Sequence, residues 1–237
     1  MLPPPFFDRD ARVVARDLLG CVLRRRHGAL WLSARIIETE AYLHEERGSH
    51  ASLGRTPSRE ALFMRPGTIY MYFSRAGDSF NVSCRGPGNA VLFKSAVPHL
   101  DARSGRESLE RMAKLNPRRD GGMRDPDRLC SGQTLLCGSL DLKVRRWTGR
   151  SFDSDELYVE DVGWSVPEVV QTRRLGIPEG RDEHLLYRYV DAVEARRCTQ
   201  NPLSKRAWTE GRDYRMLRAG EPDPEIRGSR EPPTPRA

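Results

Sequence analysis

The sequence predicts an α+β protein in which a mixed β-sheet is flanked by helices. Short runs rich in β-branched and aromatic residues recur between turn residues and read as strands. Strand and helix signals do not alternate regularly and no internal repeat is present, which disfavours a doubly wound parallel sheet. The 237 residues suffice for one large domain or two small ones with ample core.

The predicted elements begin with a helix that Asp8 or Asp10 can cap and that Gly20 ends. Residues 21–23 and 29–42 are predicted to form a hairpin around His27-Gly28. Further strands are expected at residues 68–73, 90–93 and 187–190, and further helices at 108–115 and, after a Ser-Gly turn, within 129–140.

The C-terminal stretch differs in composition from the rest of the chain. From Ala219 onward it is polar, charged and rich in proline. Such a segment buries too little apolar surface to fold, so we expect a domain of residues 1–218 followed by a disordered tail of residues 219–237.

The net charge is +7, and arginine supplies most of the positive charge. A surface of this sign most often binds nucleic acid by neutralising phosphates, although a solubilising arginine bias gives the same composition. No apolar run is long enough for a membrane helix, and the N-terminus lacks the pattern of a secretory signal. Five scattered cysteines without a Cys-x-x-Cys pair indicate reduced thiols in a cytosolic compartment and no metal site.

The segment Arg35-Ile36-Ile37-Glu38-Thr39-Glu40-Ala41-Tyr42 is the most informative part of the predicted hairpin. It reads as a strand with a carboxylate where a core strand has an apolar residue. Because side chains alternate across a strand, Ile36, Glu38, Glu40 and Tyr42 are expected on one face unless a β-bulge intervenes. A carboxylate beside an aromatic ring on a rigid strand suits a site that holds a flat ring and activates water against it. The alternative is a solvated outer face of an antiparallel strand.

This segment and others along the chain resemble the alkyladenine (3-methyladenine) DNA glycosylases of mammalian type. The resemblance covers most of residues 6–200, and its specific part is the distance between Glu-Thr-Glu-Ala-Tyr and Met-Arg-Pro-Gly-Thr. The matching stretches are Phe6-Phe7-Asp8, residues 15–20, residues 37–42, His50, residues 63–68, Tyr70, Tyr72, Asn81, Leu129-Cys130-Ser131-Gly132 and Arg174-Leu175-Gly176-Ile177.

The resemblance implies a single compact domain with a curved antiparallel β-sheet, flanking helices and a protruding β-hairpin. It implies an enzyme that flips a damaged purine, such as 3-methyladenine, hypoxanthine or ethenoadenine, out of duplex DNA and hydrolyses its N-glycosidic bond. No metal or organic cofactor is implied, and we expect a monomer in the cytoplasm, associated with the nucleoid if the source is bacterial. Carried over by residue, the roles are water activation by Glu40, stacking on the flipped base by Tyr42 and Tyr72, contact with that base and its sugar-phosphate by His50, crowding of the guanine 2-amino group by Asn81, and contacts with DNA by Ser131 and Gly132. Lys94 stands where the family commonly has an arginine near the catalytic water and the nucleotide's phosphate, so the charge is kept and the bidentate fork is lost.

The chemistry accounts for these residue types. Rotating a nucleotide out of the duplex costs roughly a few kcal/mol, and less for a damaged base. A purine alkylated at N3 or N7 is cationic, and stacking on each tyrosine ring would attract it by about 0.5–2 kcal/mol. As the base leaves, the sugar gains oxocarbenium character, which a carboxylate stabilises while it accepts a proton from the attacking water.

Several alternatives remain open. Glu38 is the rival catalyst. Tyr70 and Tyr72 are alternatively core aromatics, which is the preferred interpretation of Tyr70. His50 is alternatively a surface or core histidine, Asn81 a turn residue, and Lys94 a Schiff-base nucleophile. For the whole protein, the alternatives are a duplex-DNA-binding protein of the same fold without glycosylase activity, and a carbohydrate-active hydrolase that pairs Glu38 with Glu40.

Two segments depart from the family pattern. In residues 73–80, one residue shorter than in the family, Arg75 stands where relatives carry a tyrosine that enters the minor groove, and we expect Arg75 to fill the gap left by the flipped base. After Ser131-Gly132, Gln133-Thr134-Leu135 stands where a proline and a lysine are usual, so one phosphate contact is expected to be missing.

Overall fold

The computed structural model describes residues 1–74, 77–205 and 208–226. Its helices are α1 (Pro4–Phe7), α2 (Ala11–Asp17), α3 (Arg106–Leu115), α4 (Gln133–Ser139) and α5 (Val144–Trp147). Short 3-10 helices lie at His50–Leu53, Pro57–Phe63, Pro126–Arg128 and Ala195–Arg197. Its strands are β1 (Val22–His27), β2 (Leu30–Tyr42), β3 (Ile69–Ser74), β4 (Gly77–Ser83), β5 (Ala90–Pro98), β6 (Leu157–Glu160), β7 (Glu168–Thr172), β8 (Arg188–Asp191) and β9 (Tyr214–Arg218).

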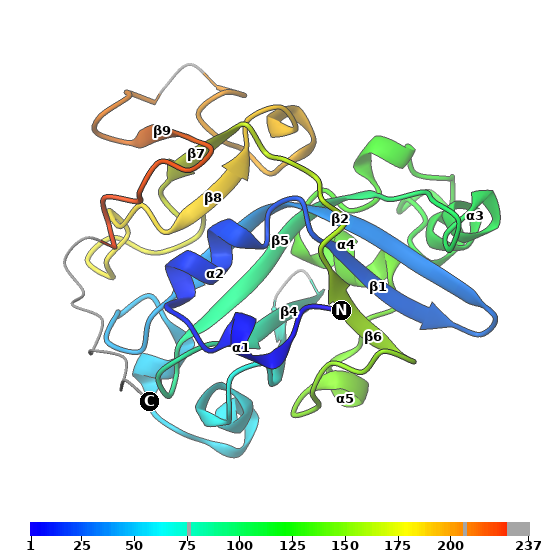
Figure 1. Cartoon of the computed structure of the whole chain (residues 1–237), viewed down its shortest axis with the longest axis horizontal. Coiled ribbons are helices and arrows are strands. Elements are labelled where there is room, and N and C mark those ends of the chain that lie inside the picture. The colour runs from blue at the N-terminus through cyan, green and yellow to red at the C-terminus, as the bar shows by residue number, and fades with distance from the viewer. Residues whose placement is uncertain (75–76, 206–207, 227–237) are drawn as a thin grey trace, which may run out of the picture.

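The strands form a single nine-stranded sheet, in the order β3-β4-β5-β2-β8-β7-β9, with β1 added beside β2 and β6 beside β1 (Figure 1). Every pairing between these strands is antiparallel. The α+β fold on an antiparallel sheet is therefore confirmed. The mixed sheet expected from the residue pattern is wrong in strand direction.

Strand β2 organises the sheet because both of its edges are paired. Its first half pairs with β1, while its second half lies between β5 and β8. Residues 38–40 therefore have a strand on each side, which fixes their backbone away from solvent. The predicted hairpin of β1 and β2 is confirmed, with Gly28 at a positive φ of 63° in its turn.

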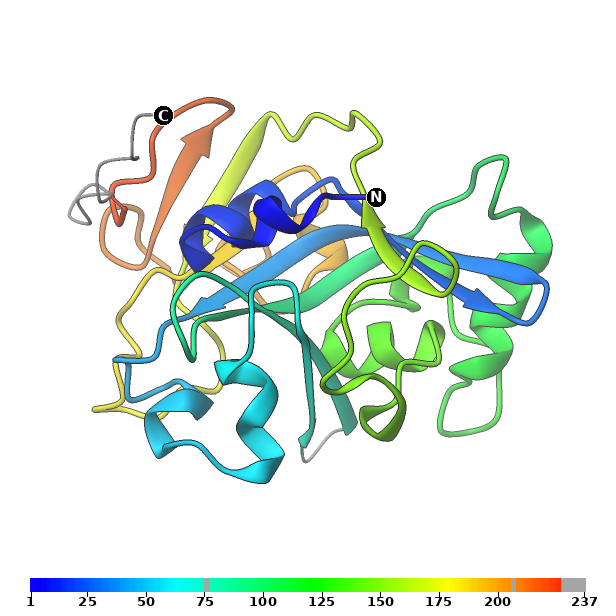
Figure 2. The same ribbon diagram turned by 60° about the horizontal axis from the view of Figure 1, so that its bottom comes forward.

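The predicted first helix is confirmed as α2. The Asp10 side chain accepts a hydrogen bond from the Arg12 amide at its N-terminus, and Gly20 follows with a φ of +86°. The Thr39 hydroxyl donates to the Ala15 carbonyl at 2.7 Å and joins the helix to β2. In Figure 2, α1 and α2 lie over one face of β2 and β5, and the cyan segment between β2 and β3 lies beyond the other.

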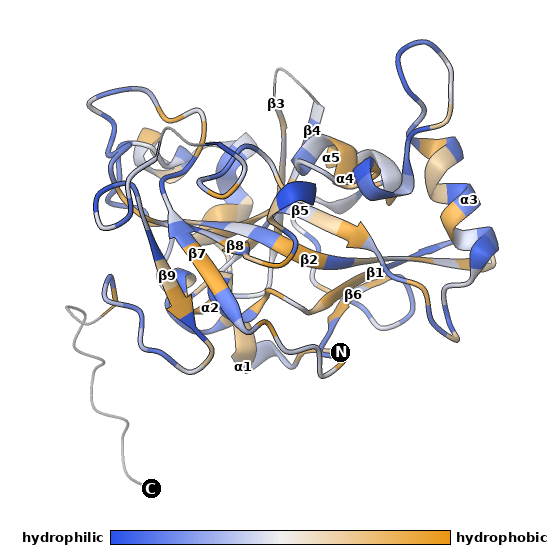
Figure 3. Ribbon diagram, turned by 90° about the horizontal axis from the view of Figure 1, so that it is seen from above, coloured by the Kyte–Doolittle hydropathy of each residue, from blue (hydrophilic) through white to orange (hydrophobic). Residues whose placement is uncertain are grey.

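The main core fills the space between α2, the sheet and helices α3 and α4, with Trp147 from α5 fully buried in it. Figure 3 shows hydrophobic stretches along β2 and β5 through the centre of the molecule, with mainly hydrophilic loops outside. Burial of this apolar surface supplies the main driving force for the fold. Within the described ranges, no helix is both long and apolar enough to cross a lipid bilayer.

Residues 219–226 contact the domain. Asp223 is 5% exposed and accepts hydrogen bonds from Gln171 at 2.8 Å and from the Tyr189 hydroxyl at 2.7 Å. Arg12 also donates to the Glu225 carbonyl at 2.6 Å. The predicted disorder therefore does not extend to these residues, because a buried carboxylate anchors them. Residues 227–237 lie outside the described part of the chain, and for them the tail stays a prediction.

Candidate active site

Two register shifts in β2 separate Ile36 from the polar side chains that follow it on one face of the sheet. The pairing of β2 with β5 shifts between Ile36 and Glu38 and again between Glu38 and Thr39. Ile36 therefore packs in the main core with α2, on the side to which Thr39 bonds. Glu38, Glu40 and Tyr42 are left together on the opposite face. The intervening β-bulge thus removes Ile36 from the predicted set.

Glu40 is fully buried, with a polar partner at each carboxylate oxygen. The Lys94 ammonium lies 3.2 Å from Oε1, and its side chain is 12% exposed. The Tyr42 hydroxyl donates a 2.7 Å hydrogen bond to Oε2. Burial alone would raise the pKa of the Glu40 carboxyl, but the charges of Lys94 and Arg188 and the hydrogen bond from Tyr42 hold it below its ordinary value. Glu40 is therefore ionised at neutral pH.

Glu38 is also fully buried, but its oxygens are occupied by the fold. They accept hydrogen bonds from the hydroxyls of Ser95 and Thr199, from the Thr199 amide at 3.0 Å, and from Arg188 at 3.3 Å. Strands β2, β5 and β8 and the segment after β8 meet at this carboxylate. Neither Glu38 nor Glu40 itself lines the cavity described next, but two partners of Glu40 do.

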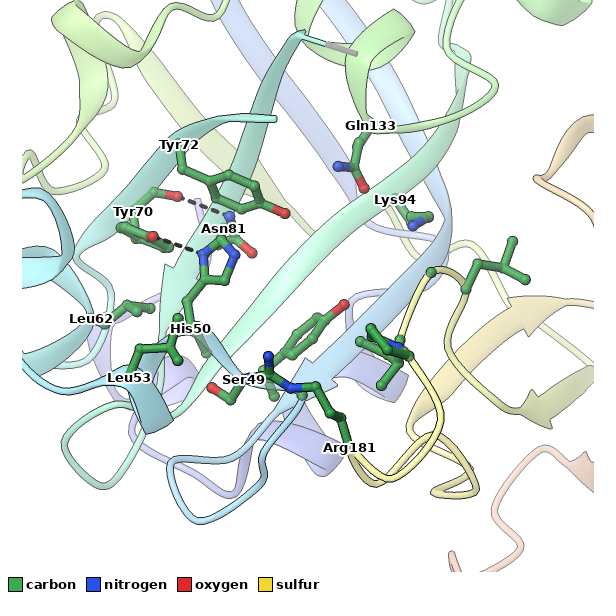
Figure 4. A pocket seen from close by; sticks show the side chains of 17 residues that line it. Ser49, His50, Leu53, Leu62, Tyr70, Tyr72, Asn81, Lys94, Gln133 and Arg181 are labelled. Carbon is green, nitrogen blue, oxygen red and sulfur yellow. Dashed lines mark hydrogen bonds between the residues drawn. The ribbon is translucent and has the colours of Figure 1, made fainter. Parts of the chain in front are cut away.

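A cavity of about 330 Å³ opens beside this pair of carboxylates. Tyr42 and Lys94, the two side chains bonded to Glu40, line it. Across from them Tyr72 stands against His50, with ring centroids 4.3 Å apart, and His50 Nδ1 lies 3.1 Å from the Tyr70 hydroxyl (Figure 4). This volume is at the lower end of the roughly 300–1,000 Å³ typical of small-molecule sites. The cavity thus suits a compact, flat ligand.

The predicted pocket residues Asn81 and His50 and the predicted core residue Tyr70 all line the cavity. The Asn81 side chain donates to the Tyr70 carbonyl at 3.2 Å across the β3–β4 hairpin and lines the cavity, so it lies in a strand rather than a turn. Tyr70 is 3% exposed, as expected of a core residue, yet it also lines the cavity. Burial, with the positive charges of Arg59 and Arg181, lowers the pKa of His50 and favours its neutral form.

The predicted DNA-contact residues fall into different settings. Lys94 lines the cavity beside Glu40. Ser131 and Gly132 precede α4, and the Gly132 amide donates to the Ser95 hydroxyl at 3.0 Å, beneath the Glu38 cluster. Arg75 lies outside the described residues, so its predicted role stays a prediction.

Further cavity residues were not predicted as site residues. Gln133 donates to the Ser79 hydroxyl at 2.7 Å and faces the cavity above Lys94 in Figure 4. The segment after β7 closes another wall with Leu175, Gly176, Ile177, Pro178 and Arg181. The resemblance at Arg174-Leu175-Gly176-Ile177 was the available signal for this wall, but these residue types carry no chemistry of their own.

Metal-ligating side chains do not gather in the part of the chain that the structure describes. No group of three or more His, Cys, Asp or Glu residues there could hold a metal ion. The five cysteines are unpaired and buried. Burial raises the pKa of Cys130 to about 12, so its thiol is protonated.

Comparisons with known proteins agree with this architecture. The family model described as methylpurine-DNA glycosylase matches residues 5–195. A protein of Pseudomonas savastanoi pv. phaseolicola is 58% identical over 219 residues, which cover 92% of this chain and 98% of that protein. A Pseudomonas aeruginosa protein is 58% identical over 225 residues, which cover 95% of this chain and 93% of that protein. A Koribacter versatilis protein is 36% identical over 193 residues, which cover 78% of this chain and 88% of that protein. All three carry the name "Putative 3-methyladenine DNA glycosylase". This chain therefore belongs to the methylpurine-DNA glycosylase family of DNA repair enzymes.

Proposed function

We propose that this protein flips an alkylated purine out of duplex DNA into the cavity and hydrolyses its N-glycosidic bond with a water that Glu40 activates. The main support for this proposal is the position of Glu40. Its ionised carboxylate contacts two side chains that line the cavity, Tyr42 and Lys94. The names of the relatives point to 3-methyladenine as the lesion. Hypoxanthine and ethenoadenine are further candidates of similar size.

In the proposed reaction the bond between C1′ and the base nitrogen breaks, and its electron pair leaves with the base. The water oxygen then bonds to C1′, and one of the water protons passes to the Glu40 carboxylate. The negative charge of Glu40 also stabilises the positive charge that develops on the sugar. Tyr42 and Tyr72 would hold the base by stacking, with His50 and Asn81 at its edges.

The surroundings of Glu38 support Glu40 as the base. Glu38 accepts four hydrogen bonds from side chains and backbone of the protein. A carboxylate saturated in this way has little capacity to accept a proton from water. The same saturation argues against a carbohydrate-active pair of Glu38 and Glu40, because both carboxylates would have to reach the substrate.

The test uses labelled duplexes that carry hypoxanthine, ethenoadenine or an alkylated adenine, with undamaged duplex as the control. Wild type, Glu40→Gln and Glu38→Gln are incubated with each, and alkali then cleaves any abasic site. We expect wild type to release at least one damaged base, and Glu40→Gln to bind the duplex without releasing it. Release that survives in Glu40→Gln would refute Glu40 as the catalyst. Binding by wild type without any release would leave a DNA-binding protein.

A further inference from the structure

We propose that Tyr42 is a positioning residue as well as a wall of the cavity, and that its hydroxyl holds the Glu40 carboxylate in the orientation used for hydrolysis. This inference rests on the proposed function of Glu40. It assigns two separable roles to one side chain, in that the ring contacts the base and the hydroxyl acts through the carboxylate.

The hydrogen bond is partly buried and joins two neighbouring side chains on one face of a strand. Tyr42 and Glu40 are two residues apart on β2, so that both project from the same face. The hydroxyl oxygen lies 2.7 Å from Oε2 of Glu40, which is 0% exposed. The other oxygen, Oε1, faces the Lys94 ammonium at 3.2 Å and accepts a long hydrogen bond from the Leu175 amide at 3.5 Å. With Oε2 held by Tyr42, the carboxylate cannot rotate without breaking this hydrogen bond. A hydrogen bond to a charged group is stronger than one between neutral groups.

The Tyr42 ring is itself anchored. The Arg174 guanidinium lies 4.6 Å from the ring centroid, and its Nη1 donates to the Ala41 carbonyl at 2.9 Å. Arg174 also forms a buried ion pair with Glu46, which in turn accepts the Leu43 amide at 2.7 Å. Tyr42 is thus fixed at its backbone, and a cation packs on its ring. A hydroxyl on a ring held in this way can set the orientation of its acceptor.

Tyr72 provides a contrast within the same cavity. It stacks with Tyr70 at a centroid distance of 5.8 Å and contacts His50, while the phenolic hydrogen bond to Glu40 comes from Tyr42. Burial, reinforced by the charge of Glu40, raises the pKa of Tyr42 well above its ordinary value, so its hydroxyl keeps the proton that it donates. That hydrogen bond also contributes to the lowered pKa of Glu40.

The experiment compares Tyr42→Phe with Tyr72→Phe, since each keeps an aromatic ring and loses one hydroxyl. Single-turnover base release from a hypoxanthine or ethenoadenine duplex is measured between about pH 4 and 8, with duplex affinity measured by anisotropy. Loss of one hydrogen bond to a charged group predicts a rate about tenfold lower for Tyr42→Phe, with little change in affinity. The acid limb is the acidic part of the rate–pH profile, where the release rate falls as Glu40 is protonated. This limb should move to higher pH for Tyr42→Phe, whereas Tyr72→Phe should keep the wild-type limb. Incorporation of 3-fluorotyrosine at position 42, a stronger donor, should move the limb to lower pH.

The outcomes separate this inference from the proposed function. Suppose that wild type releases the base. If the acid limb of Tyr42→Phe then does not move, or if Tyr72→Phe moves it equally, the positioning role alone is overturned. No base release by wild type from any duplex would overturn the proposed function and the positioning role with it. Thermal unfolding of each variant confirms that the folded protein is being compared.

Discussion

The ammonium group of Lys94 lies 3.2 Å from Oε1 of Glu40, although the two residues are not cross-strand partners. Glu40 pairs with Leu92, while the register shift at Glu38 leaves Lys94 without a partner on β2. Lys94 lies two residues from Leu92 and so shares the face of Glu40 by strand alternation. The shift places Ser95, rather than Lys94, opposite Glu38, and Lys94 forms its ion pair with Glu40.

Replacement of Lys94 should change the pH dependence of base release. Lys94 lowers the pKa of Glu40, and the active form of Glu40 is ionised, so activity is lost as pH falls through that pKa. Lys94→Met removes the charge, raises the pKa of Glu40 and should move the acid limb to higher pH. Lys94→Arg keeps the charge and is the control. If the acid limbs of the rate–pH profiles of Lys94→Met and wild type coincided in single-turnover assays, this role of Lys94 would be contradicted.

Glu38 should be needed for stability. Glu38→Ala leaves the buried Arg188 without its ion-pair partner, a loss that typically costs about 3–5 kcal/mol. We expect Glu38→Ala to lower the free energy of unfolding by about that amount in urea titrations. Glu110→Ala breaks an exposed pair with Arg106 on α3 and should change it by less than about 1 kcal/mol. Equal effects of the two substitutions would show that the Glu38 cluster is not a structural anchor.

Gly77 should be required for the hairpin that carries Tyr72. Its φ is +134°, and an added Cβ would lie 2.7 Å from Cγ2 of Thr134. Gly77→Ala should therefore destabilise the protein and weaken base release. Gly28→Ala, at a φ of +63° with nothing within 4 Å, should cost only about 1–2 kcal/mol of backbone strain.

A double variant isolates the steric part of the Gly77 effect. Thr134→Ser removes Cγ2, so Gly77→Ala should be less damaging in that background, as measured by melting temperature and release rate. If Thr134→Ser gave no relief, contact between α4 and the hairpin would not be the cause.

The segment 219–226 should contribute to stability. A chain that ends at residue 218 leaves Gln171 and the Tyr189 hydroxyl buried without Asp223, at a cost of about 1–3 kcal/mol for each unsatisfied group. A chain that ends at residue 226 keeps these hydrogen bonds. We expect a lower melting temperature for the chain ending at 218. Equal melting temperatures of the chains ending at 218 and 226 would show that residues 219–226 do not stabilise the domain and belong to the tail.

Local signals in the sequence were sufficient for several elements. Helix α2 has its cap, apolar stripe and terminal glycine within eleven consecutive residues, 10–20. The hairpin of β1 and β2 closes around a glycine that tolerates positive φ. Strands β4, β6, β7 and β9 were not among those expected from the residue pattern. Length is not the reason, because β8 has only four residues and was expected.

The sequence by itself determined the family, the antiparallel fold that the family implies, and the chemical types of the candidate site residues. Those follow from residue identity and spacing, which need no coordinates. Only the tertiary structure decided the surroundings of the two neighbouring carboxylates. Glu38 and Glu40 differ little in sequence, but the fold surrounds Glu38 with Ser95, Thr199 and Arg188 and places the cavity-lining Lys94 and Tyr42 against Glu40. The partners come from strands and segments up to about 160 residues away along the chain, and no local pattern encodes such contacts.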